Sequence, residues 1–165
     1  MNSVQMHLML THVPIILSIT GLVMFIVALL IKNTTLTKTS YIIIVIAGVA
    51  SLPVFFTGEG TEEAIERMPG VSEAIIEKHE EIAKLAMASI VAAGILALAA
   101  LLSFQKTMVA RVLKVVVLLL AIASSSLMAQ TAHLGGQIRH TEIRNAAGGR
   151  DAQGLGKQQQ DQDDD

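Results

Sequence analysis

Four apolar stretches, each long enough to cross a lipid bilayer, dominate this sequence. They cover residues 8–31, 40–57, 82–104 and 112–129, and their only Lys, Arg, Asp or Glu residues are Lys84 and Lys114. A hydrocarbon core of about 30 Å requires roughly 20 residues of helix, with about 17 as a lower limit. The sequence therefore predicts an all-α integral membrane bundle of four transmembrane helices, surrounded by the lipid bilayer.

The charges in the connections predict how the chain is oriented. Segments 32–39 and 105–111 contain Lys or Arg and no acidic residue. Short basic loops face the cytoplasm according to the positive-inside rule. We therefore expect two short cytoplasmic loops, with both termini and the connection 58–81 on the outer, periplasmic side. Arg139 and Arg144, after the last stretch, favour the opposite orientation.

The connection 58–81 is longer and acidic, and its pattern predicts partial helix. Residues 61–68 should form a short helix that ends at Pro69 and Gly70, because proline cannot continue a helix and glycine suits a turn. From Ser72 an apolar stripe resumes beside a row of glutamates. The third helix should therefore begin in water and run unbroken into the bilayer.

Glycine and polar residues predict further boundaries. The glycines on both sides of Glu59 favour a turn, and Gly135 and Gly136 mark a point at which the fourth helix can end. Residues 145–165 are rich in Gly, Gln and Asp and offer no apolar face. We expect this tail to be disordered and distinct from a transmembrane domain of residues 1–144.

The second and third spans are expected to approach each other closely. Their small residues are Ala47, Gly48, Ser51, Ala86, Ala93, Ala97 and Ala100.

Charge and cysteine content exclude several functions. The formal net charge is −2, and no basic patch exists of the kind that nucleic acid binding requires. The chain has no cysteine, so disulfides, thiol catalysis, Cys-ligated metal sites and covalent haem attachment through paired cysteines are excluded, and a cofactor must be held by His, carboxylate or Met. No nucleophile-and-base motif indicates an enzyme, and no ionisable residue lies near the middle of a span, where transporters bind their substrates.

The histidines are the main functional signal. With an even number of spans, both termini and the middle connection lie at the same membrane face, and every histidine falls in or beside one of these segments. His12 precedes Pro14 and should occupy the first helical turn, where proline is tolerated. His79 lies on the apolar stripe of its helix and should point into the bundle. The five residues expected at this face are His7, His12, His79, His133 and His140.

Converging imidazoles suit three kinds of chemistry: axial ligation of haem iron, binding of a non-haem metal, and proton transfer near neutral pH. A b-type haem takes two facing histidines between helices, and we place His12, His79 and His133 in the candidate pool. A non-haem metal site would add carboxylates, and its candidates are His7, His140, Glu59 and Glu80.

Two segments carry a resemblance to a known family. They are the run from His7 to Ile15, which contains His-Val-Pro, and the run from Thr131 to His140, which contains His-Leu-Gly-Gly. Over roughly residues 5–143 the chain resembles a family of bacterial four-helix integral membrane proteins, known mainly as a domain of unknown function. The resemblance implies a bacterial inner membrane and suggests haem binding through His12, His79 and His133.

Three functions therefore compete. The first is a membrane protein that binds b-type haem near its outer face for electron transfer or redox sensing, with a redox or membrane-protein partner. The second is a metal-binding membrane protein without haem. The third is an accessory subunit without a cofactor, whose acidic connection docks a partner.

Overall fold

All four apolar stretches are helices in the computed structural model, which describes residues 3–65, 71–103 and 107–139. Within these ranges the chain has no strand, and each helix contains a segment long and apolar enough to cross a membrane. The all-α, four-helix prediction is confirmed, and the helices fit a multi-pass membrane protein. They are α1 (Ser3–Leu30), α2 (Thr34–Ile65), α3 (Glu73–Leu102) and α4 (Thr107–Arg139).

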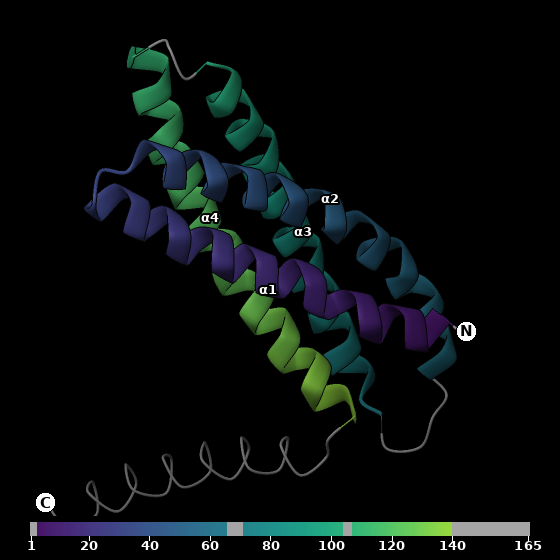
Figure 1. Ribbon diagram of the computed structural model, residues 1–165. Coiled ribbons are helices and arrows are strands. Elements are labelled where there is room, and N and C mark those ends of the chain that lie inside the picture. Colours follow the sequence, from purple (N-terminus) through teal and green to yellow (C-terminus); the bar gives the residue numbers. More distant parts are fainter. Residues whose placement is uncertain (1–2, 66–70, 104–106, 140–165) are drawn as a thin grey trace, which may run out of the picture.

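The helices form two hairpins that lie across each other (Figure 1). One hairpin is α1 with α2, the other is α3 with α4, and α2 also packs closely on α3. Contact between α1 and α4 is much weaker, and α1 and α3 lie diagonally across the bundle. The four-helix arrangement is therefore closed on three sides and looser on the fourth, between α1 and α4.

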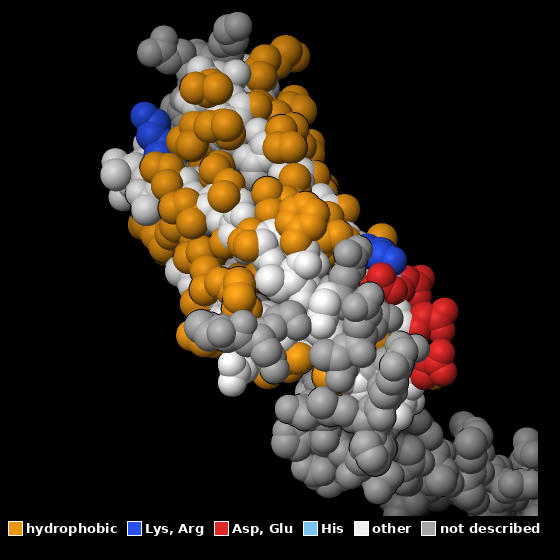
Figure 2. All heavy atoms as spheres, turned by 90° about the vertical axis from the view of Figure 1, so that its right-hand side faces the viewer, with side chains coloured by type: hydrophobic (Ala, Val, Ile, Leu, Met, Phe, Trp, Pro, Cys, Tyr) orange, Lys and Arg blue, Asp and Glu red, His pale blue; other side chains and the backbone are white. Residues whose placement is uncertain are grey.

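The outer surface is largely hydrophobic (Figure 2). Large apolar side chains face outward on every helix, for example Ile16 on α1, Val49 on α2, Ile95 on α3 and Leu119 on α4. Lipid around a membrane-spanning bundle is as apolar as these side chains, so their exposure is expected there. Acidic side chains gather near one end of the face in Figure 2, and Glu73, Glu77 and Glu81 at the start of α3 are exposed.

The helices extend beyond the apolar stretches, which corrects several predicted boundaries. The predictions of a turn at Glu59 and of a separate helix at residues 61–68 are wrong, because α2 continues past Glu59 to Ile65. Thr57 and Thr61 donate hydroxyl hydrogen bonds to carbonyls one turn earlier, at Pro53 and Thr57, and so stay compatible with the helix. Residues 66–70 lie outside the described residues. The unbroken third helix is confirmed, since α3 begins directly after Ser72.

The structure also corrects the predicted position of Pro14 and the predicted end of α4. Pro14 is not in the first turn but eleven residues into α1, where it is buried. Helices in membranes tolerate such a proline because neighbouring groups satisfy the freed carbonyl. Gly135 and Gly136 do not end α4, which continues to Arg139. The predicted disordered tail, 145–165, and His140 lie outside the described residues.

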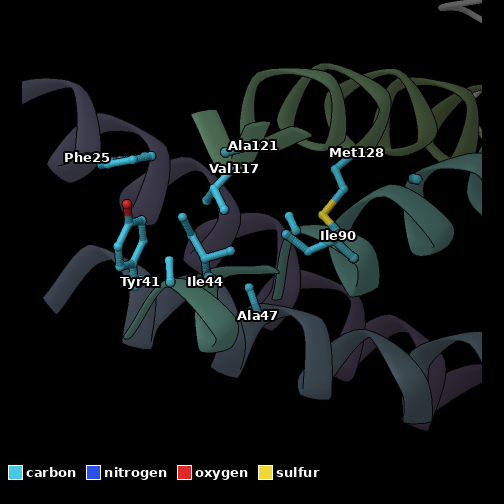
Figure 3. Packing of buried hydrophobic residues seen from close by; sticks show 12 residues of the cluster. Phe25, Tyr41, Ile44, Ala47, Ile90, Val117, Ala121 and Met128 are labelled. Carbon is cyan, nitrogen blue, oxygen red and sulfur yellow. The ribbon is translucent and has the colours of Figure 1, made fainter. Parts of the chain in front are cut away.

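The main hydrophobic core runs from Phe25 and Tyr41 to Met128 (Figure 3). Phe25 and Tyr41 meet edge to face with ring centroids 5.0 Å apart. Ile44, Ile90 and Val117 are fully buried beside them. The core therefore joins all four helices through large side chains from each hairpin.

Small residues bring α2 and α3 together, as predicted. A Cβ added to Gly48 would lie 3.1 Å from the carbonyl oxygen of Ile90, and one added to Gly94 would lie 3.5 Å from that of Ile44. The facing alanines Ala47, Ala86, Ala93 and Ala97 are buried. The two helices thus pack with their backbones almost in contact.

Candidate functional site

A cavity of about 540 Å³, open on one side, lies at the far end of the main hydrophobic core from the α1–α2 connection and is lined by all four helices. This volume lies within the range of about 300–1,000 Å³ that is typical of small-molecule sites. Its walls are mostly apolar, with Ile15, Val54, Phe55, Ile76, Met87 and Met128 among them. Three histidines, His7, His12 and His79, also line it. The other polar residues of the lining are Thr11, Ser51, Thr61, Glu80 and Thr131.

His7 extends from α1 toward α2. Its Nδ1 lies 3.1 Å from the carbonyl oxygen of Val54 and 3.2 Å from Oγ1 of Thr57. A carbonyl oxygen can only accept, so Nδ1 carries the proton and donates it. The neutral ring then has its lone pair on Nε2, and no hydrogen-bond partner for that atom occurs among the described residues.

His79 is held in the same manner by α4. Its Nδ1 donates to the carbonyl oxygen of Thr131 at 3.0 Å, so its Nε2 also carries a lone pair. As for His7, the described part of the chain supplies no hydrogen-bond partner to this Nε2. Both rings are partly buried, and both line the cavity.

Two glycines face these rings, and the contact is tight at Gly135 and ordinary at Gly58. A Cβ at Gly135 would lie 3.3 Å from Cε1 of His79, and one at Gly58 would lie 3.6 Å from Cε1 of His7. By contrast, a Cβ at Gly136 would have nothing within 4 Å. Sequence reasoning interpreted Gly58 and Gly135 as turns or helix breaks, whereas each lies inside a helix and faces an imidazole.

His12 lines the cavity from a more exposed position. Its Nδ1 donates to the carbonyl oxygen of Leu8, one turn earlier in α1, at 2.9 Å. The ring is therefore oriented by its own helix, whereas a neighbouring helix holds His7 and His79. Its Nε2 also retains the lone pair.

His133 lies outside the cavity lining. Its ring is exposed, and its Nε2 accepts a hydrogen bond from the amide nitrogen of Gln137 at 2.9 Å. Of the predicted haem pool, the structure thus places His12 and His79 on the cavity and His133 beside it. It adds His7, which the sequence had suggested for a metal.

The carboxylates predicted for a metal site contribute little to the described cavity. Glu80 lines it, but its carboxylate forms an ion pair with Lys84 at 2.8 Å on the partly exposed side of α3. No three His, Asp or Glu side chains converge as metal ligands within the ranges 3–65, 71–103 and 107–139. His140 and the side chain of Glu59 lie outside what the structure describes.

Comparison with known proteins gives no relationship. No family model matches the chain, and neither does any curated protein or solved structure. The function must therefore be argued from the cavity and its histidines.

Proposed function

We propose that this chain is a multi-pass membrane protein that binds one b-type haem in the cavity, with His7 and His79 as its axial ligands, for electron transfer or redox sensing. The observation that carries the proposal is the common orientation of the two rings. Each donates Nδ1–H to a backbone carbonyl of a neighbouring helix. Histidines that ligate metals are fixed in this way, because the hydrogen bond sets the tautomer and leaves Nε2 as the ligand.

The positions of the two helices support axial ligation from opposite sides. His7 is on α1 and His79 is on α3, and these helices lie diagonally across the bundle. Haem supplies four nitrogen ligands of its own, so one or two imidazoles complete the coordination. The apolar walls suit the macrocycle, and the iron would exchange one electron between its ferric and ferrous states.

This assignment narrows the ligand pool. His12 is exposed and held by its own helix, and the Nε2 of His133 is already hydrogen-bonded to Gln137. We therefore assign neither as an axial ligand. A metal ion without haem needs three or more protein ligands at a structural or catalytic site, and such a site would have to include a side chain outside the described residues, for example His140 or Glu59.

The test is absorption spectroscopy of the detergent-purified protein, expressed with sufficient haem, in its oxidised and dithionite-reduced forms. We expect a Soret band that shifts on reduction and a sharp α band. His7→Ala and His79→Ala should each remove or strongly alter this spectrum, whereas His133→Ala, the matched control at an exposed histidine, should preserve it.

Two outcomes would overturn the proposal. One is a featureless spectrum in protein that is folded and saturated with haem. The other is a normal spectrum in both His7→Ala and His79→Ala. Elemental analysis of the same samples separates haem iron from another metal, and a stoichiometric partner without cofactor would favour an accessory subunit.

We further propose that the bilayer is the bacterial inner membrane and that both termini lie on the periplasmic side. The basic connections 32–39 and 105–111 support this orientation. All three cavity histidines would then lie toward the periplasmic face.

A further inference from the structure

The cavity has an opening on one side of the bundle. Of the residues that line it, those exposed at the molecular surface are Leu8 and His12 on α1 and Ala132 on α4, and none of the lining residues on α2 or α3 is exposed. The opening therefore lies between α1 and α4, the neighbouring helices with the weakest contact. We call Leu8, His12 and Ala132 the mouth.

The mouth faces the side of the bundle and lies within the candidate spans of both helices, Val4–Leu30 and Met108–Ile138. Exposed apolar side chains adjoin it on α1, where Met9 is 67% and Val13 is 44% exposed. In a bilayer that covers both spans, a molecule that reaches the cavity through this opening comes from the lipid phase.

His12 gives the mouth a polar group. Its Nδ1 is bonded to the carbonyl oxygen of Leu8, so Nε2 is an acceptor at the rim of an otherwise apolar opening. A matching ligand has a ring with a hydroxyl that donates to Nε2 and an apolar tail that remains in the bilayer. Lipid-soluble quinols have both parts.

We propose that the mouth binds a lipid-soluble quinol, which exchanges electrons with the redox group in the cavity. This inference rests on the proposed haem for its redox part, but the binding of the ring does not depend on it. Oxidation of one quinol to quinone releases two electrons and two protons. Ferric haem, when bound, would supply a one-electron acceptor, so one quinol would require two equivalents of haem-loaded protein; His12 Nε2 accepts the first proton and water accepts the second.

Binding can be measured without haem, because the chain has no tryptophan. Leu8→Trp places a single fluorophore at the mouth, and Ile16→Trp places one on the same helix at a residue that is 60% exposed and outside the cavity lining. The haem-free proteins are placed in phosphatidylcholine vesicles and titrated with a short-tailed quinone, which quenches tryptophan. We expect saturable quenching of Leu8→Trp at a quinone concentration at least tenfold below that needed for Ile16→Trp.

A second experiment compares a variant that blocks the mouth with a control variant that carries the same substitution elsewhere on α4. Ala132→Phe fills the opening, whereas Ala129→Phe adds the same ring to an exposed alanine of α4 that does not line the cavity. In the Leu8→Trp background, Ala132→Phe should abolish the saturable quenching and Ala129→Phe should retain it. In haem-loaded protein, Ala132→Phe should slow reduction by quinol at least tenfold, with the rate of reduction by dithionite unchanged.

The possible results separate the two proposals. Saturable quenching at the mouth in a protein that never binds haem would support the quinol site and overturn the proposed haem. Equal, unsaturable quenching of Leu8→Trp and Ile16→Trp in a protein with a normal haem spectrum would overturn the quinol site alone. Quenching of Leu8→Trp by brominated phosphatidylcholine that the quinone does not relieve would assign the mouth to phospholipid and likewise overturn it.

Discussion

Gly135 and Gly136 allow the position of His79 to be tested by two substitutions of the same kind. Both glycines lie inside α4, so replacing either with alanine should raise helix propensity by about 1 kcal/mol. The added methyl group meets different surroundings in the two cases. At Gly136 nothing lies within 4 Å, whereas at Gly135 the new Cβ would be 3.3 Å from Cε1 and 3.6 Å from Nδ1 of His79.

The cost at Gly135 follows from what holds the ring. A contact of 3.3 Å requires the imidazole or α4 to move by a few tenths of an ångström. The hydrogen bond from His79 Nδ1 to the carbonyl oxygen of Thr131 is 3.0 Å long, and its donor is on the side approached by the methyl group. Losing such a bond costs about 0.5–1.5 kcal/mol. This loss offsets the helical gain in Gly135→Ala and leaves the gain intact in Gly136→Ala.

The expected difference in the free energy of unfolding between the two variants is therefore about 1 kcal/mol, in favour of Gly136→Ala. For a chain of this length it corresponds to about 2–4 °C in Tm. Thermal unfolding in detergent, followed by circular dichroism, measures the difference without haem. If haem is bound, the Soret and α bands of Gly135→Ala should also change, and those of Gly136→Ala should remain as in the unsubstituted protein.

Equal Tm values for the two variants, together with identical spectra, would refute this reasoning. Such a result would mean that the ring of His79 is not confined between α3 and α4. A lower Tm for Gly136→Ala than for the unsubstituted protein would contradict the helical course of α4 through this segment.

Four other predictions concern separate features. Gly48→Val should lower the unfolding free energy by about 1–3 kcal/mol, because its Cβ would lie 3.1 Å from a backbone oxygen of α3 that cannot turn aside; thermal unfolding measures the loss. Thr57→Val removes one of two acceptors of His7 Nδ1 and should weaken haem binding about tenfold in a haem titration, with the carbonyl of Val54 still in place. Glu80→Gln should change the unfolding free energy by less than about 0.5 kcal/mol, since its ion pair with Lys84 is partly exposed. Alkaline phosphatase fused after Arg139 should be active, because the proposed orientation places this end in the periplasm; an inactive fusion with an active cytoplasmic reporter would reverse the orientation.

Hydropathy was sufficient to predict the number and type of the helices. The apolar stretches fix four spans because hydrocarbon excludes unpaired backbone groups and admits only helices or closed barrels. The same signal placed the carboxyl-terminal ends of the second and fourth helices too early. Hydropathy measures apolar content, and α2 and α4 continue through polar and glycine-containing segments that are not apolar enough to count as part of a span.

The site was only partly predictable for a related reason. Counting spans predicted that the histidines lie at one face, and His7, His12 and His79 do line one cavity. The groups that orient the rings are backbone carbonyls of Val54 and Thr131, which have no signature in the sequence. Gly135 carried a signal, but it was interpreted locally as a helix break, whereas a side chain at this position would press on the imidazole of His79 from another helix.

The cavity, of about 540 Å³, opens between α1 and α4, so in a membrane it is filled by water, by lipid or by a ligand. Water is a poor filler, because a water molecule needs two to four polar partners and most of the wall is apolar. The proposed haem, a largely apolar group that also takes imidazole ligands, would fill this space and pair the Nε2 atoms of His7 and His79. The bundle therefore differs along its length. Near Phe25 large side chains fill the space between the helices, whereas beside His79 the four helices leave a cavity.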